Sequence, residues 1–311
     1  MTSDAAYDGI IVIGAPRSGT TLLRRILNAH PDIACPGETN VLAACARFLH
    51  SETIAEGVDV GVLSGLSFAG FDEDRVLTAL RDFAFGFHRE YAKKQGKGRW
   101  ASKTAFDVFY LDAIDRLCGD HAYFICLQRH GLDVAWSLKE LCDTNGVYLS
   151  ELHDYIKRYP RPLEAFCHAW VDVSAATRTF VERHPDNAML VKYEDLAADP
   201  EAVTRAIAQF VRVDWTPQWM ADAMQTPKSI GLGDWKTYAK DKVDTDSVGR
   251  WRKLSEHTVS MMGRICNPML EASGYPPVAV QEERSTQEAR RRYELGMRIR
   301  GRRKGGSDAG D

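Results

Sequence analysis

The chain has 311 residues, of which 44% are hydrophobic and 27% are charged, and this is the composition of a globular protein. Its net charge of −3 supplies no basic field for binding nucleic acid, and no apolar run approaches the roughly 20 residues that cross a bilayer. The seven cysteines include no C-x-x-C pair and the N-terminus is polar and acidic, so we expect reduced thiols, no metal site and a cytoplasmic location.

The chain begins with the pattern of a strand, a glycine-containing loop and a helix. Residues 9–13 form an unbroken apolar run, which is typical of a strand buried on both faces of a parallel sheet. After the loop 14–20, Leu and Ile recur at helical spacing until Asn28-Ala-His-Pro31 ends the helix. These three elements are the usual start of an α/β domain.

Predicted helices and strands alternate along the rest of the chain, with glycine-rich loops around 57–70 and 226–251. Further strands are expected over 122–127 and 189–191, and further helices over 41–50, 72–94, 132–142, 163–184 and 201–211. This alternation predicts a single α/β domain with a doubly wound parallel sheet, a P-loop and flanking helices.

The predicted domain covers residues 1–280, and residues 281–311 differ from it in composition. They are rich in charge, and we expect a surface helix to about Ile299 followed by a disordered end. The arginines of this helix are either solvated or form a partner contact, for example in a possible homodimer.

The loop Gly14-Ala-Pro-Arg-Ser-Gly-Thr-Thr21 has the context that a phosphate-binding loop needs, with backbone N–H groups and a helix N-terminus directed at one anion. Its G-x-x-x-x-G spacing is that of nucleoside triphosphatases, but Thr20 replaces their lysine and Arg17 supplies a cation within the loop. No predicted strand ends in the Asp that would hold Mg²⁺. The alternative is a glycine-rich turn without a ligand. The residues predicted to bind the anion are Gly14, Pro16, Arg17, Ser18, Gly19, Thr20 and Thr21.

Two stretches of this region resemble the sulfotransferases that use 3′-phosphoadenylyl sulfate (PAPS). Residues 14–23 look like their 5′-phosphosulfate loop. Ala29-His-Pro-Asp-Ile-Ala-Cys-Pro-Gly-Glu-Thr39 is similar to the group that contains tyrosylprotein sulfotransferases and many bacterial enzymes. The resemblance covers most of residues 9–255, and it implies PAPS as cofactor and adenosine 3′,5′-bisphosphate (PAP) as product.

Three further segments are similar to the cofactor site of that family. Arg129-His-Gly-Leu-Asp-Val-Ala-Trp-Ser137 resembles its 3′-phosphate motif, in which a guanidinium fork and a hydroxyl suit a terminal phosphate. Tyr193 matches a tyrosine that lies near the adenosine, and a buried core aromatic is the alternative. Pro227-Lys-Ser-Ile-Gly-Leu-Gly-Asp-Trp-Lys236 looks like the R-K-G-x-x-G-D-W-K loop, which places Lys228 and Ser229 at the cofactor.

Sulfuryl transfer needs cations where negative charge builds up and a base that takes the acceptor's proton. We expect Arg17 and Lys103 to be the cations, because Ser102-Lys-Thr-Ala-Phe106 resembles the segment in which the family's lysine faces the bridging oxygen. Ala105 stands where cytosolic sulfotransferases carry a histidine. The resemblance to the tyrosylprotein group therefore assigns the base to Glu38, against the alternative of a surface glutamate that caps the next helix. The next candidates for the base are His50 and His88.

Together these features predict a sulfotransferase that moves the sulfuryl group from PAPS to a hydroxyl of a small-molecule, lipid or natural-product acceptor. Segments 40–100 and 139–165 contain no cofactor motif and are expected to shape the acceptor pocket. A P-loop kinase-like phosphotransferase is one alternative, although it needs the lysine and the Mg²⁺-binding acid that are missing here. An idle nucleotide-binding partner protein is the other.

Overall fold

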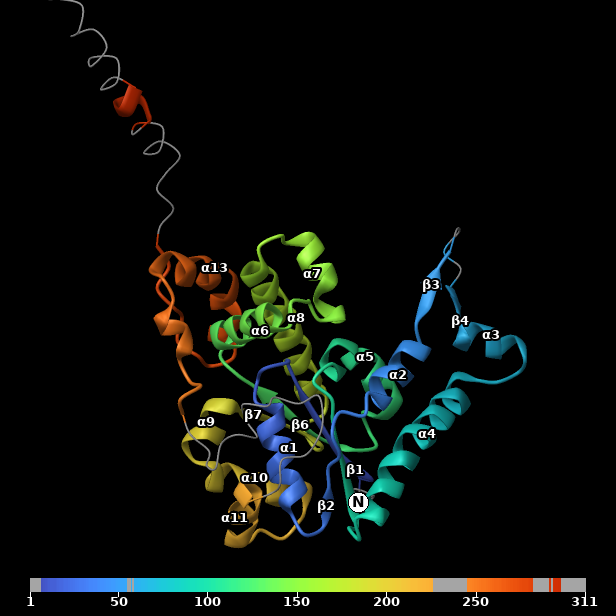
Figure 1. Cartoon of the computed structure of the whole chain (residues 1–311). Coiled ribbons are helices and arrows are strands. Elements are labelled where there is room, and N and C mark those ends of the chain that lie inside the picture. Colours follow the sequence, from blue (N-terminus) through green and yellow to red (C-terminus); the bar gives the residue numbers. More distant parts are fainter. Residues whose placement is uncertain are drawn as a thin grey trace, which may run out of the picture.

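A five-stranded parallel sheet forms the centre of the computed structural model, which describes residues 7–54, 57, 59–225, 245–281, 291 and 293–297 (Figure 1). Its strands lie in the order β2-β5-β1-β6-β7. Their bounds are β1 Gly9–Gly14, β2 Ile33–Ala34, β5 Arg99–Lys103, β6 Tyr123–Gln128 and β7 Ala188–Lys192. The strands expected over 9–13, 122–127 and 189–191 are confirmed, and so is the doubly wound α/β fold.

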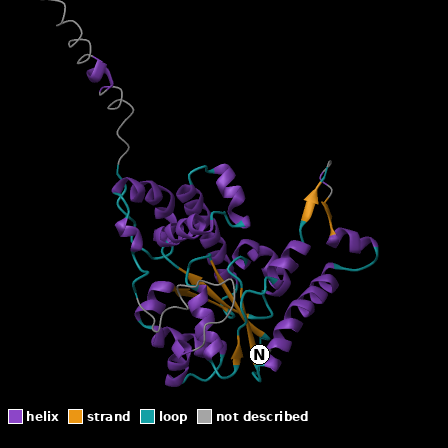
Figure 2. Ribbon diagram, viewed as in Figure 1, coloured by secondary structure: helices purple, strands orange, loops and turns teal. Residues whose placement is uncertain are grey.

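Helices cover both faces of the sheet (Figure 2), and alternate residues of β1 point to the two layers. Ile10 and Val12 belong to one core, with α1 (Thr20–Ala29), α9 (Tyr193–Ala198), α10 (Pro200–Val211) and α11 (Pro217–Gln225). Ile11 and Ile13 belong to the other, with α2 (Val41–Phe48), α4 (Glu73–Lys94), α5 (Leu111–Cys118), α6 (Gly131–Asn145), α8 (Pro162–Arg183) and α13 (Glu256–Ala272). A strand between two helical layers must be apolar on both sides, as the run 9–13 indicates.

The main difference from the expected elements lies in an arm that projects from the body (Figure 1). Instead of a loop, residues 57–70 contain β4 (Asp59–Gly61) and α3 (Val62–Phe68), and β4 pairs antiparallel with β3 (Ser51–Thr53). No residue of α3 is buried, and Gly65 interrupts its apolar pattern. Smaller elements on the described part of the body are α7 (His153–Arg158) and the 3₁₀ helices at Asp107–Tyr110, Ser150–Leu152 and Arg250–Lys253.

Two predictions lie largely outside the described residues. The structure describes only residues 245–251 of the expected loop 226–251. It describes residues 281, 291 and 293–297 of the C-terminal segment, and residues 293–297 are helical. Within the described part of the chain, no helix is both long enough and apolar enough to span a membrane.

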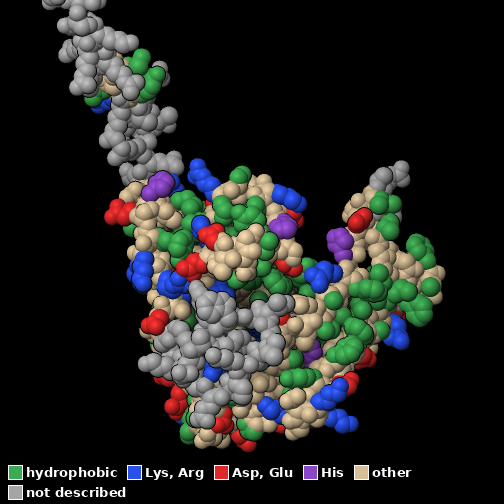
Figure 3. All heavy atoms as spheres, in the orientation of Figure 1, with side chains coloured by type: hydrophobic (Ala, Val, Ile, Leu, Met, Phe, Trp, Pro, Cys, Tyr) green, Lys and Arg blue, Asp and Glu red, His purple; other side chains and the backbone are tan. Residues whose placement is uncertain are grey.

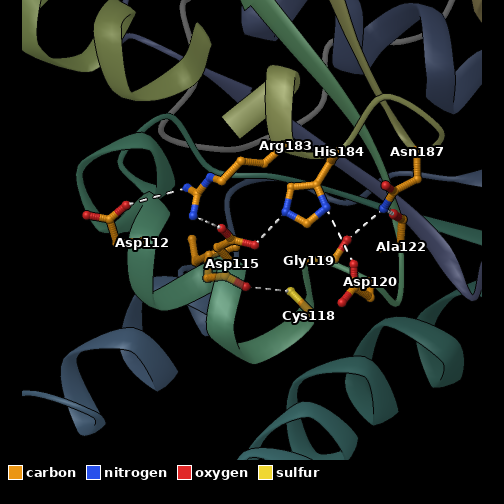
Figure 4. A network of polar contacts seen from close by, with 10 residues as sticks. Asp112, Asp115, Cys118, Gly119, Asp120, Ala122, Arg183, His184 and Asn187 are labelled. Atoms are coloured by element: carbon orange, nitrogen blue, oxygen red, sulfur yellow. Dashed lines mark hydrogen bonds and ion pairs between the residues drawn. The ribbon is translucent and has the colours of Figure 1, made fainter. Parts of the chain in front are cut away.

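A polar network joins α5 to the end of α8 at the amino-terminal edge of the sheet (Figure 4). His184 Nε2 lies 2.7 Å from Asp115 Oδ1, and Asn187 Nδ2 donates to two carbonyl oxygens just before β6, those of Gly119 (2.6 Å) and Ala122 (2.8 Å). Ligand sites of parallel α/β sheets lie at the opposite, carboxyl edge. We therefore interpret this histidine–aspartate pair as structural, because it fixes the starts of β6 and β7.

Candidate active site

The carboxyl ends of four neighbouring strands bring the predicted site residues together. The P-loop follows β1, Lys103 ends β5, Arg129 follows β6 and Tyr193 follows β7. Gly14 pairs with Leu127 in the parallel register, so β1 and β6 end at the same level. This edge is where open α/β sheets bind their ligands.

Backbone geometry shapes the P-loop into an anion cradle. Arg17 (φ 74°) and Gly19 (φ 99°) adopt the left-handed conformation. Between them, Ser18 donates from its backbone N and its Oγ to the carbonyl oxygen of Ala15, at 3.0 and 2.6 Å. Backbone that alternates between left-handed and other conformations turns neighbouring amides to one side. Helix α1 begins after Gly19, and no side chain caps its N-terminus. Its first-turn amides therefore face the loop as anion donors.

Close packing explains why small residues occupy this loop. A Cβ on Gly19 would overlap the ring of Tyr193, and a Cβ on Gly14 would come within 2.8 Å of the carbonyl oxygen of Leu127. The neighbouring loop and helix residues, which are Pro16, Ser18, Thr20 and Thr21, are buried. The loop therefore holds one backbone shape, as a preorganised anion site requires.

Arg17 connects the loop to both residues of the predicted 3′-phosphate pair. Its Nε donates to Ser137 Oγ at 3.0 Å, and its carbonyl oxygen accepts from Arg129 Nη1 at 2.9 Å. The guanidinium carbon of Arg129 lies 4.5 Å from the centre of the Tyr193 ring. Tyr193 is thus a buried core residue that packs between Gly19 of the P-loop and Arg129, which leaves its predicted place near the adenosine a prediction.

Lys103 and Glu38 form a buried ion pair beside the P-loop. Lys103 Nζ donates to Glu38 Oε1 and lies 3.4 Å from Thr21 Oγ1, and the two side chains are only 2% and 12% exposed. Asn40, and not Glu38, is the residue that precedes α2. Neither an exposed lysine nor a helix-capping glutamate therefore describes these side chains. The pair places a cation and a carboxylate at the edge of the anion cradle.

Asp133 was not singled out from the sequence, although it holds a segment against the site. Its carboxylate accepts from the amides of Gly249 (2.7 Å) and Trp251 (3.0 Å). Arg129 Nη2 donates to the carbonyl oxygen of Ser247 in the same segment. Lys228 and Ser229 lie outside the described residues. The signal in the sequence was an acid in the first turn of a helix that directly follows a candidate phosphate ligand.

Of the two histidines considered as other bases, His50 is exposed just after α2 and His88 is buried in α4. His88 is buried with its ring centre 5.2 Å from that of Trp100, and burial lowers its pKa to about 4. Burial also lowers the pKa of His130 to about 4, and its ring stacks on Trp251. Among the described residues, no group of three or more His, Cys, Asp and Glu side chains could hold a metal ion.

The model of the sulfotransferase family matches residues 9–217, which include the P-loop, Glu38, Lys103, Arg129 and Ser137. The chain belongs to the sulfotransferase family. It is 25% identical to protein-tyrosine sulfotransferase 1 of Danio rerio over an alignment of 279 residues. This alignment covers 87% of this chain and 73% of that protein. It is 28% identical to nodulation protein NoeE of Sinorhizobium fredii over an alignment of 263 residues, and this alignment covers 81% of this chain and 61% of that protein.

Solved structures of sulfotransferase domains have the same fold as this sulfotransferase. The domain from the curacin biosynthetic pathway superposes with a TM-score of 0.56 at 17% identity, over 88% of this chain and 99% of that one. The domain from the olefin synthase of Synechococcus PCC 7002 also superposes with a TM-score of 0.56, at 20% identity, over 89% of this chain and 99% of that one. These likenesses concern the arrangement of the sheet and its helices.

This sulfotransferase has a cavity of about 430 Å³ in the hollow between the projecting arm and the lobe of α6, α7 and α8 (Figure 3). Its walls are α2, the 3₁₀ helix Asp107–Tyr110 and α5. Glu38 lies just before α2 and Lys103 just before the 3₁₀ helix, so the segments that carry the ion pair continue into the walls of the cavity. The polar side chains in the walls are Arg47, His50, Ser51, Tyr110, Asp112 and Arg116.

Proposed function

We propose that this sulfotransferase moves the sulfuryl group from PAPS to a hydroxyl of a small-molecule, lipid or natural-product acceptor. The observation that carries the proposal is the convergence of the anion cradle, the Arg129–Ser137 region and the Lys103–Glu38 pair at one edge of the sheet. An anion site next to a buried cation and a carboxylate has the groups that sulfuryl transfer to a hydroxyl needs.

The residues present fit PAPS, which carries a 3′-phosphate and a 5′-phosphosulfate. Arg129 Nε is buried and has no hydrogen-bond partner in the described part of the chain, so it is a donor available to the 3′-phosphate. The P-loop amides, with Arg17 and Thr20, would hold the 5′-phosphosulfate. Tyr193 would form a wall next to the adenosine side. When bound, PAPS supplies an activated sulfuryl group whose leaving group is a phosphate.

The chemistry assigned to the chain is proton removal and charge stabilisation. Glu38 would accept the proton of the acceptor hydroxyl as the new S–O bond forms. Lys103 and Arg17 would place positive charge beside the bridging and equatorial oxygens, where negative charge increases. The pairing of Lys103 with Glu38 keeps both groups ordered before the acceptor arrives, so little reorganisation is needed during transfer.

The size of the cavity favours an acceptor of small-molecule dimensions, although the residues that line it do not include Glu38 or Lys103. A volume of about 430 Å³ lies within the usual 300–1,000 Å³ of small-molecule sites. The wall residues Arg47 and Tyr110, joined at 3.3 Å, supply polar contacts beside apolar side chains such as Leu49 and Val108. A tyrosine of a protein, the acceptor named in the protein-tyrosine relatives, is the competing acceptor.

We also propose a cytoplasmic location for this sulfotransferase. All seven cysteines are buried with free thiols, which suits a reducing compartment. Cell fractionation with an antibody to the protein tests this location, and recovery in a secreted fraction would contradict it.

Calorimetry with PAP and AMP tests the cofactor. PAP should bind far more tightly, because its 3′-phosphate adds charge-assisted hydrogen bonds of about 1.5–3 kcal/mol each. Equal affinity for the two nucleotides would contradict the assignment, and stabilisation by ATP with Mg²⁺ but not by PAP would favour a kinase-like enzyme. Labelled PAPS with aliphatic alcohols, phenols and tyrosyl peptides then tests the acceptor, and transfer to the peptides alone would overturn the small-molecule proposal.

A further inference from the structure

Side chains from two other elements hold both polar atoms of the peptide group between Arg129 and His130. The carbonyl oxygen of Arg129 accepts from Trp170 Nε1 of α8 at 3.1 Å, and the amide of His130 donates to Glu194 Oε1 of α9 at 2.9 Å. Arg129 and His130 are buried, and they connect β6 to α6. Because a peptide group is planar, these two bonds fix the direction in which the Arg129 side chain leaves the backbone.

Both carboxylate oxygens of Glu194 accept hydrogen bonds. Oε1 accepts from the His130 amide, and Oε2 accepts from the hydroxyl group of Tyr275 at 2.8 Å. The Tyr275 ring packs edge-on against the His130 ring, with 5.4 Å between the ring centres. Hydrogen bonds to a carboxylate are stronger than those between neutral groups, so Glu194 joins the turn after β6 firmly to the segment that follows α13.

Two further bonds fasten the segment after α13 to the same edge of the sheet. Gln128 Nε2, at the end of β6, donates to Ser273 Oγ at 2.6 Å. Lys192 Nζ, at the end of β7, donates to the carbonyl oxygen of Gly274 at 3.0 Å. Residues 273–275 therefore each bind a residue at or directly after the end of β6 or β7, and this keeps Tyr275 in place beside the carboxylate.

The first turn of α9 also contacts the guanidinium group of Arg129. Tyr193 directly precedes Glu194, and its ring centre lies 4.5 Å from the guanidinium carbon. Arg129 Nη1 and Nη2 donate to the carbonyl oxygens of Arg17 and Ser247. Arg129 Nε is buried without a hydrogen-bond partner in the described part of the chain. The guanidinium group is thus held in one place, with one buried donor left for a ligand.

We propose that Glu194 is a positioning residue for PAPS, which holds the Arg129–His130 peptide group so that the Arg129 guanidinium meets the 3′-phosphate. The inference rests on the proposed role of Arg129 at that phosphate. Without the carboxylate, the His130 amide loses its acceptor and the peptide group can turn. The guanidinium group then shifts, and its hydrogen bonds to the phosphate weaken because such bonds depend on distance and angle.

This role has a consequence for nucleotide binding that a purely structural role would not produce. A substitution that only destabilises the fold affects PAP and AMP binding alike, because the folded protein binds both. Loss of the positioning affects PAP alone, since AMP has no 3′-phosphate. The ratio of PAP affinity to AMP affinity therefore reports on the position of the Arg129 guanidinium.

The test is calorimetry with PAP and AMP on the wild type, Glu194→Ala and Glu194→Gln. Glu194→Ala should lower the affinity ratio about tenfold, the effect of one lost hydrogen bond to a charged group. Glu194→Gln should keep most of the ratio, because its oxygen accepts from the His130 amide and its NH₂ group donates to the Tyr275 hydroxyl. Asn187→Ala is the matched control, since it loses two buried hydrogen bonds at the opposite end of β7 and should keep the wild-type ratio. An unchanged ratio in Glu194→Ala would overturn the proposal.

Tyr275→Phe gives a second test that does not depend on the folding of Glu194→Ala. It keeps the ring against His130 and removes only the hydroxyl group that donates to Glu194, so the ratio should fall by a smaller factor. An unchanged ratio in this variant would also overturn the proposal. Equal affinity of the wild type for PAP and AMP would instead mean that the proposed cofactor is wrong. A ratio that falls in Arg129→Ala but not in Glu194→Ala would leave the cofactor in place and refute the positioning role alone.

Discussion

Replacement of Glu38 by Gln should affect both stability and turnover, for separate reasons. The change removes the negative partner of Lys103, whose side chain is 2% exposed, and breaking a buried ion pair costs about 3–5 kcal/mol. We expect the lower end, about 3 kcal/mol, because Glu38 is 12% exposed and the Gln oxygen still accepts from Lys103. Turnover should fall by about 10²–10⁴-fold, since an amide does not take up the acceptor's proton.

Urea unfolding and initial rates with two acceptors measure these effects. A phenol has a lower pKa than an aliphatic alcohol and needs less help from a base, so phenol turnover should be partly retained. Lys103→Met leaves the opposite charge buried alone, and the double variant should be less destabilised than the sum of the two single variants. Nearly full turnover of Glu38→Gln on the aliphatic alcohol would refute the assignment of the base, and an unchanged unfolding free energy would refute the buried pair.

The remaining predictions concern five other substitutions. Gly19→Ala should weaken PAP binding in calorimetry. A Cβ at this position would overlap the Tyr193 ring, and the left-handed backbone would be strained by about 1–3 kcal/mol. Gly86→Ala, in α4 with open space around it, should instead stabilise the fold by about 0.5–1 kcal/mol. Asn187→Ala should lower the unfolding free energy by about 2–4 kcal/mol in urea, since two buried carbonyl groups lose their donor. Arg129→Ala should remove most of the difference between PAP and AMP affinity, and an unchanged difference would place the 3′-phosphate elsewhere. Because burial raises the pKa of Asp107 to about 8, its protonated form stabilises the fold at low pH and this contribution is lost as the pH rises toward 8. Asp107→Asn should therefore gain up to about 1.4 kcal/mol per pH unit relative to wild type between pH 5 and pH 8, and a flat difference in urea unfolding would contradict this.

Elements with strong apolar patterns could be predicted from the sequence. The run 9–13 and its helix became β1 and α1, and α8 lies within one residue of the expected helix. β5 was missed because Arg99-Trp-Ala-Ser-Lys103 has no apolar run, although it lies between β2 and β1 in the sheet. β2 has two residues, too few for any periodicity. In both strands, pairing with neighbours decides the structure more than local propensity does.

Motif spacing located the candidate site, whereas its contacts required the structure. The loop 14–21, Lys103 and Arg129 were singled out by their motifs, and the structure places all three at the carboxyl edge of the sheet. That Arg17 donates to Ser137, 120 residues away, depends on the P-loop and α6 meeting in space. Asp107 carried no signal, because a buried acid and an exposed acid look alike in one sequence and only the packing around it distinguishes them.

Transfer of ³⁵S from labelled PAPS is the measurement that tests the central claim most directly. With a panel of aliphatic and phenolic hydroxyl compounds, the wild-type protein should produce a labelled acceptor and PAP in equal amounts. Lys103→Met and Glu38→Gln should lose most of this transfer to an aliphatic acceptor, while Asp120→Asn, which changes a side chain that is 88% exposed, retains it. A protein that binds PAP tightly but transfers label to no hydroxyl compound or tyrosyl peptide would contradict the account, because it would be a nucleotide-binding protein without the proposed chemistry.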